Sequence, residues 1–197
     1  MSEFKDLKRP KVDLGSIIEA ETAPKEKMEF LFSGKTSFLK KKAYMAGKLF
    51  NDADRAQREK EYKLLIEANR RFSIDIEVFS PMYAPINDKS TMPTSLDIFN
   101  GDESPLMSSD VVFADLSDFD PGVMMEIGMI VHKNVSLYAY LPDIRIQTAG
   151  EYKGIHVPFG SNQFVIGGIE KHFGKVYSNF DQALEAYIRD HAGKIVN

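Results

Sequence analysis

A strand, an acidic loop and a helix follow one another over residues 110–128, and this succession constrains the fold more than any other feature. Residues 110–116 (DVVFADL) are mostly apolar, which is typical of a strand buried in a parallel sheet. The next residues (SDFDPG) combine acidic side chains with turn formers, and a helix is expected from Gly122 to Lys133. This order indicates a βαβ unit, and open α/β sheets place their ligands where such strands end.

Glu126 is a carboxylate within an otherwise apolar stretch of that helix. Its neighbours there are Val123, Met124, Met125, Ile127 and Met129. An anion in such surroundings costs free energy unless it is paired or used. Asp120 lies six residues earlier, directly before the helix. Two carboxylates at the end of a buried strand indicate acid–base or nucleophilic chemistry on a neutral, polar substrate.

Strands and helices alternate from residue 41 onward. Strands are expected at 43–46, 74–79, 110–116, 135–141 and 175–177, and helices at 52–72, 96–108, 122–133 and 180–191. The helical pattern of 96–108 is interrupted at Asn100–Gly101, and long loops are expected at 80–95 and 142–168. Alternating strands and helices form parallel sheets with right-handed crossovers. We therefore predict an α/β fold of the flavodoxin-like type, with a five-stranded parallel sheet in the order 2-1-3-4-5 flanked by helices.

The first 40 residues differ from the rest of the chain in polarity and in their broken periodicity. Charged side chains are mixed there with Pro10, Gly15, Pro24 and Gly34. We expect an N-terminal extension over residues 1–40, at most partly ordered, and a single domain over residues 41–197.

The composition argues against several classes of function. The 25 basic and 29 acidic residues give a net charge of −4 without a basic stripe, so a nucleic acid polymer is not an expected partner. There is no cysteine, hence no disulfide, thiol nucleophile or thiolate metal site. The four histidines lack the spacing of a metal site, and no apolar run reaches transmembrane length. We expect a cytoplasmic protein that binds no membrane.

Four pieces of sequence in a fixed order carry a family resemblance. They are Tyr44-Met45-Ala46-Gly47 with Phe50 after it, Asn100-Gly101-Asp102 with Asp110 eight residues on, Asp120 with Met125-Glu126-Ile127-Gly128, and residues 158–164 (PFGSNQF). In these pieces, over residues 41–190, the chain resembles the nucleoside 2-deoxyribosyltransferases. The acidic loop with its Glu–apolar–Gly helix is the most specific of them. The chain departs from members that end on an aromatic residue, since it ends Lys194-Ile195-Val196-Asn197.

The resemblance implies a role for four acidic or phenolic side chains. Glu126 would be the nucleophile, Tyr44 would position it, and Asp102 and Asp120 would hold the nucleobase and assist its protonation. The chemistry is consistent, because a carboxylate can trap an oxocarbenium-like state while a second group protonates the leaving base. A second base then attacks the glycosyl-enzyme, which gives retention by a ping-pong route. No metal or redox cofactor is required.

The resemblance also implies the substrates and a shared active site. The 2-deoxyribosyl group would pass between 2′-deoxyribonucleosides and free nucleobases. Gly47 and Phe50 would belong to the substrate-binding set. Asn162 would reach from a neighbouring subunit to the sugar, so a homo-oligomer is expected.

Each residue also has a purely structural interpretation. Glu126 would turn to solvent or pair with a lysine, and Asp120 would only cap its helix. Asp102 would belong to an Asn–Gly–Asp turn, and Asn162 would be a turn former in a loop. Tyr44 would be a packing residue of the core.

Two other functions compete with transfer. The first is hydrolysis of a nucleoside or nucleotide N-glycosidic bond by the same fold. Nucleotide-cleaving relatives tend to carry Arg–Gly–Gly after the first strand and a serine six residues before the glutamate. Here Gly47-Lys48-Leu49-Phe50 and Asp120 stand at those places, and an aspartate repels phosphate, although Lys48 would attract it. The second is a non-catalytic sensing module, which would leave Glu126 buried without a task.

Overall fold

The computed structural model describes residues 40–87, 90, 92–143, 151–152, 155–156 and 162–192. The N-terminal extension expected over residues 1–40 lies outside the described residues, apart from Lys40. Four strands form a parallel sheet in the order β2-β1-β3-β4. These strands are β1 (Lys41–Ala46), β2 (Ile76–Phe79), β3 (Val111–Asp115) and β4 (Ser136–Tyr140). A separate antiparallel pair joins β5 (Glu151–Tyr152) to β6 (Ile155–His156).

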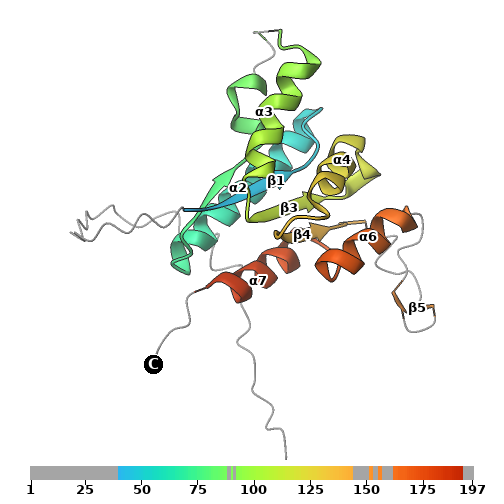
Figure 1. Ribbon diagram of the computed structural model, residues 1–197. Coiled ribbons are helices and arrows are strands. Elements are labelled where there is room, and N and C mark those ends of the chain that lie inside the picture. Colours follow the sequence, from blue (N-terminus) through green and yellow to red (C-terminus); the bar gives the residue numbers. More distant parts are fainter. Residues whose placement is uncertain are drawn as a thin grey trace, which may run out of the picture. The chain divides into compact units, whose positions relative to one another are not determined.

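Helices cover both faces of the sheet. They are α2 (Asp52–Arg71), α3 (Ser95–Met107), α4 (Pro121–Ile130), α6 (Gln163–Phe173) and α7 (Phe180–His191). Short 3-10 helices occur at Pro81–Tyr83, Pro85–Asn87 and Ser117–Phe119. Figure 1 shows α3 and α4 together on one side of the sheet and α7 on the other. No helix in the described ranges is long and apolar enough to cross a membrane.

Alternation along the strands builds a core on each face. Tyr44 of β1, Val112 of β3 and Leu137 of β4 join one buried apolar cluster with side chains of α3, α4 and α6. On the opposite face the ring of Phe113 lies 5.7 Å from Phe180 and 5.3 Å from Tyr187 of α7. Burial on both faces explains why these strands are almost continuously apolar.

The order of the strands creates a topological switch point between β1 and β3. β1 pairs with β2 on one side and with β3 on the other, all in parallel. α2, which follows β1, packs against α7, whereas α4, which follows β3, packs against α3. The chain therefore leaves the neighbouring strands β1 and β3 toward opposite faces, and ligands of open α/β sheets bind where this happens.

The prediction of a fifth strand is wrong, because the described sheet has four strands. The expected segment 175–177 forms only one parallel bridge, between Tyr177 and Tyr140. α6 ends at Gly174, which has a φ of 98°, and Asn179 already caps α7. Residues 175–178 lie between the two helix ends, and of these only Tyr177 pairs with the sheet.

Two helix predictions are also corrected. α3 runs through Asn100–Gly101 without a break, and the glycine allows close packing: a Cβ there would lie 3.0 Å from Cγ2 of Ile86. α6 begins inside the loop expected at 142–168. Its two central glycines lower helix propensity, but Ile166 and Ile169 bury a stripe in the core that outweighs this cost.

Candidate active site

Tyr44 and Glu126 meet at the switch point. Tyr44 is fully buried in β1, and its hydroxyl donates a 2.5 Å hydrogen bond to Oε1 of Glu126 in α4. The contact exists because β1 and β3 are adjacent and α4 follows β3 on the face toward which Tyr44 points. The interpretation of Glu126 as a solvent-facing or lysine-paired residue does not describe this geometry.

The surroundings change the acidity of both groups. Burial raises the pKa of Glu126 to about 7, and the charges of Asp102 and Asp120 raise it as well, while the hydrogen bond from Tyr44 acts in the opposite direction. Burial, followed by the charge of Glu126, raises the pKa of Tyr44 far above its usual value. Tyr44 therefore remains a hydrogen-bond donor, and Glu126 changes its charge near neutral pH.

Asp120 begins the helix that carries Glu126. It is 9% exposed, and its Oδ1 accepts a 3.0 Å hydrogen bond from the backbone N–H of Val123. The side chain is thus an N-cap, as its structural interpretation expects. The cap also places a carboxylate whose charge acts on Glu126.

Asp102 reaches the same region from α3. It lies inside the continuous helix, so its interpretation as part of an Asn–Gly–Asp turn is wrong. Its charge raises the pKa of both Tyr44 and Glu126. The packing of α3 against α4 thus brings together three carboxylates, those of Asp102, Asp120 and Glu126.

The loop between β3 and α4 is strained. Asp118 and Phe119 have φ values of 55° and 50°, which non-glycine residues rarely adopt. Oδ1 of Asp115 accepts hydrogen bonds from the backbone N–H and the hydroxyl of Ser117, at 2.8 and 2.6 Å. Lys48 pairs with Asp118 at 2.5 Å. These contacts hold the sharp turn that leads to Asp120.

Gly47 and Phe50 lie in the loop after β1. Gly47 contacts Arg58: a Cβ on this residue would lie 2.6 Å from Nη1 of the guanidinium. Phe50 is 80% exposed. Among the residues that the structure describes, no hydrogen bond or ring contact joins either residue to Tyr44 or Glu126.

Asn162 caps α6 and is exposed. Its side-chain oxygen accepts from the backbone N–H groups of Phe164 and Val165, at 3.1 and 3.4 Å. Within the described part of this subunit, no hydrogen bond connects Asn162 to the Tyr44–Glu126 pair. Its interpretation as a turn former in a loop gives way to that of a helix cap. The rest of the matching segment, residues 158–161, lies outside the described residues.

Sequence reasoning missed the polar partners around Lys48 and Arg58. Lys48 is held between Asp54 and Asp118, at 3.3 and 2.5 Å, so its charge is already engaged. Arg58 is 5% exposed and pairs with Asp115 at 2.7 Å. The helical periodicity of the sequence could have indicated that Arg58 is buried, because Arg58 lies on the same face of α2 as the buried Leu65. In the described parts of the chain, no three His, Asp or Glu side chains are grouped as metal ligands.

Comparisons with known proteins identify relatives by sequence and by fold. A sequence profile described as nucleoside 2-deoxyribosyltransferase matches residues 43–184. A conserved protein from Enterococcus faecalis V583 has 31% identity and a TM-score of 0.60, with 77% of this chain and 98% of that chain covered. A 2-deoxyribosyltransferase from Leishmania mexicana shares the fold, with 18% identity, a TM-score of 0.53, and 77% and 99% of the two chains covered. No curated protein sequence matches the chain.

Proposed function

The chain belongs to the nucleoside 2-deoxyribosyltransferase family, and on this premise we propose that it transfers the 2-deoxyribosyl group between nucleobases of 2′-deoxyribonucleosides. The observation that carries the proposal is the hydrogen bond from the Tyr44 hydroxyl to Glu126 beside two further carboxylates. This arrangement supplies an oriented nucleophile and an acid in one place.

The reaction proceeds in two displacements. An ionised oxygen of Glu126 attacks C1′ of the sugar, and the bond from C1′ to the base breaks with its electron pair going to the base. Asp120 delivers a proton to that base. A second base then attacks C1′, displaces Glu126 and returns a proton to Asp120. Two inversions give net retention, as in retaining glycosidases.

Tyr44 orients the nucleophile. Its hydroxyl donates a hydrogen bond to Oε1 of Glu126, so Oε2 is the oxygen that attacks the sugar. The negative charges of Asp102 and Glu126 favour the positive charge that develops on the sugar ring in the transition state, while Asp120 carries the proton for the base. Little reorganisation is then needed at the moment of reaction, because these groups are already held by β1, α3 and α4.

The charge around the site supports a nucleoside rather than a nucleotide as substrate. Asp102 and Asp120 repel a 5′-phosphate, and both raise the pKa of Glu126 by the same repulsion. Lys48, the cation nearest in sequence to the first strand end, is already paired with Asp54 and Asp118. These charges therefore support a nucleoside as the proposed substrate.

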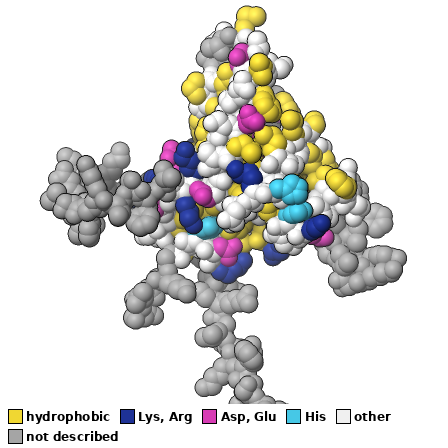
Figure 2. Space-filling model, viewed as in Figure 1, with side chains coloured by type: hydrophobic (Ala, Val, Ile, Leu, Met, Phe, Trp, Pro, Cys, Tyr) yellow, Lys and Arg dark blue, Asp and Glu magenta, His cyan; other side chains and the backbone are white. Residues whose placement is uncertain are grey.

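A homo-oligomer with shared sites is part of the proposal. Large apolar side chains are exposed close in sequence to two of the proposed site residues: Phe164 is 90% exposed and lies two residues after Asn162, and Met125 is 56% exposed and directly precedes Glu126. Figure 2 shows hydrophobic side chains gathered over α3 and α4. Contiguous apolar surface of this kind favours burial against another protein surface. A neighbouring copy would then present Asn162 to the sugar.

Base exchange tests the proposed function directly. The protein is incubated with 2′-deoxyinosine, with and without adenine, and the products are separated by chromatography. We expect 2′-deoxyadenosine when adenine is present and little hypoxanthine in its absence. Release of hypoxanthine at the same rate without adenine would instead establish a hydrolase. Glu126→Gln, which keeps an acceptor for Tyr44, is the matched inactive control.

A further inference from the structure

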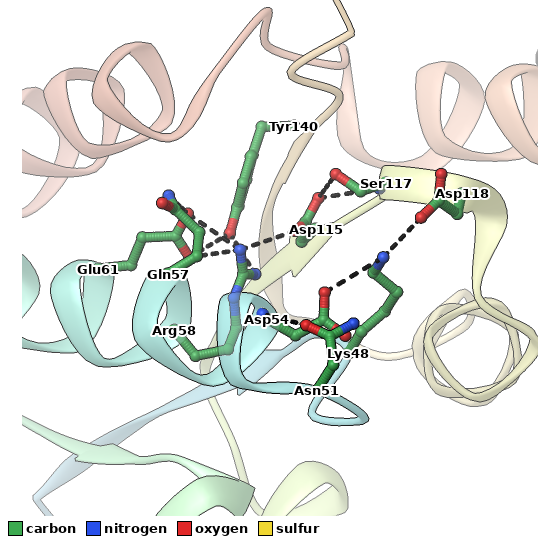
Figure 3. A network of polar contacts seen from close by, with 10 residues as sticks. All are labelled: Lys48, Asn51, Asp54, Gln57, Arg58, Glu61, Asp115, Ser117, Asp118 and Tyr140. Atoms are coloured by element: carbon green, nitrogen blue, oxygen red, sulfur yellow. Dashed lines mark hydrogen bonds and ion pairs between the residues drawn. The ribbon is translucent and has the colours of Figure 1, made fainter.

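A buried polar cluster lies at the carboxyl ends of the strands, and the proposed reaction does not use it (Figure 3). Its members are Arg58, Glu61, Asp115 and Tyr140, each at most 5% exposed. Arg58 pairs with Asp115 at 2.7 Å and with Glu61 at 3.0 Å, and it donates to the Tyr140 hydroxyl at 2.8 Å. Tyr140 in turn donates to Glu61 at 2.7 Å. We call these four residues the Arg58 cluster.

The Arg58 cluster joins the ends of three strands. Asp115 is the last residue of β3 and Tyr140 is the last residue of β4, and the two are paired in register. Gly47 directly follows β1 and lies against the guanidinium. A single side chain of α2 thus contacts the carboxyl ends of β1, β3 and β4, where the loops of the proposed site begin.

Asp115 connects the Arg58 cluster to the strained loop. Its Oδ2 pairs with Arg58, while its Oδ1 accepts from the backbone N–H and hydroxyl of Ser117. The positive φ values of Asp118–Phe119 follow at once, and such conformations persist only where the surroundings hold them. The same loop ends at Asp120, so the conformation of the loop determines the position of the Asp120 carboxylate.

Stability alone is a weak reason for this arrangement. Replacing a buried ion cluster by apolar side chains of similar volume is often neutral or stabilising. A guanidinium, in contrast, presents its donors in fixed directions, which suits it to hold several acceptors in one geometry. The Arg58 cluster is therefore better explained by the geometry that it imposes on the strand ends.

Gly47 has a specific relation to Arg58. A Cβ at this position would lie 2.6 Å from Nη1 and 2.8 Å from Cδ of Arg58. The guanidinium cannot move aside freely, because its contacts with Glu61, Asp115 and Tyr140 fix it. The absence of a side chain at Gly47 is thus a condition for the observed position of Arg58.

We propose that Arg58 is a positioning residue for glycosyl transfer: it fixes the β3–α4 loop that carries Asp120, and Gly47 is glycine to admit its guanidinium. This inference rests on the proposed function and deepens it. It assigns the requirement for glycine at this position to Arg58 rather than to the substrate.

Two tyrosines provide a matched test. Tyr140→Phe removes hydrogen bonds to Arg58 and Glu61, whereas Tyr187→Phe removes an equally buried 2.6 Å hydrogen bond to Asn69 in the layer formed by α2 and α7. Both variants should lower the melting temperature. At a temperature well below melting, kcat for base exchange should fall by about tenfold or more in Tyr140→Phe only, since small misplacements of catalytic groups are costly. Equal kcat values in the two variants would assign a merely structural role and overturn the proposal.

A double-mutant cycle separates Arg58 from the substrate as the partner of Gly47. Gly47→Ala should reduce kcat in the wild-type background, and the same substitution should have little further effect in the Arg58→Met background. Arg58→Lys should recover only part of the activity, because it restores charge without the planar donors. If Gly47→Ala costs as much with Arg58→Met as without it, glycine is required by the substrate and the proposal is wrong.

Hydrogen exchange distinguishes failure of this inference from failure of the proposed function. Amide exchange of residues 116–123, measured without any substrate, should be faster in Arg58→Lys and Tyr140→Phe than in the wild type, and unchanged in Tyr187→Phe. Protection that is unchanged in all three variants would contradict a role of Arg58 in holding the loop. If the wild type exchanges no bases, the proposed function fails, while this measurement still decides what Arg58 does.

Discussion

At the scale of single residues, the proposed chemistry depends on the charge of Glu126. Burial raises the pKa of this carboxyl to about 7, with Asp102 and Asp120 acting in the same direction. Only the ionised form can attack a sugar carbon. Tyr44 keeps its proton and donates a hydrogen bond to Glu126. The rate of transfer should therefore rise with pH through about 7.

The sign of the pKa shift of Glu126 predicts how stability depends on pH. The unfolded carboxyl loses its proton near 4.5, whereas the folded one holds it up to about 7. Between these values the native state binds more protons, so the free energy of unfolding falls as pH rises. Glu126→Gln removes this loss and should gain stability relative to the wild type as pH rises through the window. Urea unfolding of both proteins at about pH 4.5 and about pH 8 measures this difference in stability.

A constant stability difference between Glu126→Gln and the wild type across that range would contradict the assigned pKa. Base exchange should fall by about 10³-fold or more in the same variant, as is usual when a nucleophile is removed.

Substitutions of two neighbours of Glu126 should shift its pKa in opposite directions. Tyr44→Phe removes a hydrogen bond that lowers the pKa of Glu126, so the acid limb of the rate–pH profile should move to higher pH. Asp102→Asn removes a charge that raises this pKa, so the limb should move to lower pH. Profiles of kcat/KM for the three proteins report the shifts. Parallel shifts in the two variants would show that a different group controls the limb.

At the scale of elements, the β3–α4 unit determines the site, and the sequence predicted this unit well. The buried strand, the acidic loop and the helix with Glu126 all occur where the pattern placed them. α6 was missed because Gly167–Gly168 lowers local helix propensity, and only tertiary burial of its apolar stripe compensates. The Arg58–Asp115 pair was missed because a buried ion pair depends on residues that are distant in sequence.

The strain at Asp118 can be tested apart from its charge. Asp118→Gly relieves a positive φ and loses an ion pair whose acidic partner is 77% exposed. Exposed pairs contribute about 0–1 kcal/mol and strain of this kind costs ~1–3 kcal/mol, so this variant should be as stable as the wild type or more stable. Asp118→Val, in which the β-branched side chain disfavours positive φ, should be less stable. Thermal unfolding of both variants measures the difference, and a less stable Asp118→Gly would show that the ion pair dominates.

At the scale of the whole molecule, the first four strands of the predicted order 2-1-3-4-5 occur in the structure, but the sheet stops there. Alternation of apolar residues predicts which strands are buried, whereas the end of a sheet depends on the space between two helix ends. The family resemblance also predicts an active site shared between subunits. Such a site depends on surface contacts, and the periodicity of the sequence does not specify these. Phe164 at the start of α6 and Met125 on α4 are exposed apolar side chains that such an assembly could bury.

The proposed interface at the start of α6 would make assembly and activity depend on each other. Phe164→Glu places a charge on a side chain that is 90% exposed, so it should leave the fold intact while it lowers the sedimentation coefficient and the rate of exchange together. Ile66→Glu on α2, where the apolar side chain is 41% exposed on the opposite layer, is the control and should change neither. A monomeric wild type with full exchange activity would contradict the shared site.

Trapping of the glycosyl-enzyme tests whether Glu126 is the nucleophile. The protein is mixed with 2′-deoxyinosine in the absence of an acceptor base, quenched in acid and analysed by mass spectrometry after proteolysis. We expect a mass increase of one deoxyribosyl group on the peptide with Glu126, which disappears when adenine is added before the quench. No adduct in a protein that exchanges bases, or an adduct on a peptide without Glu126, would show that Glu126 is not the nucleophile.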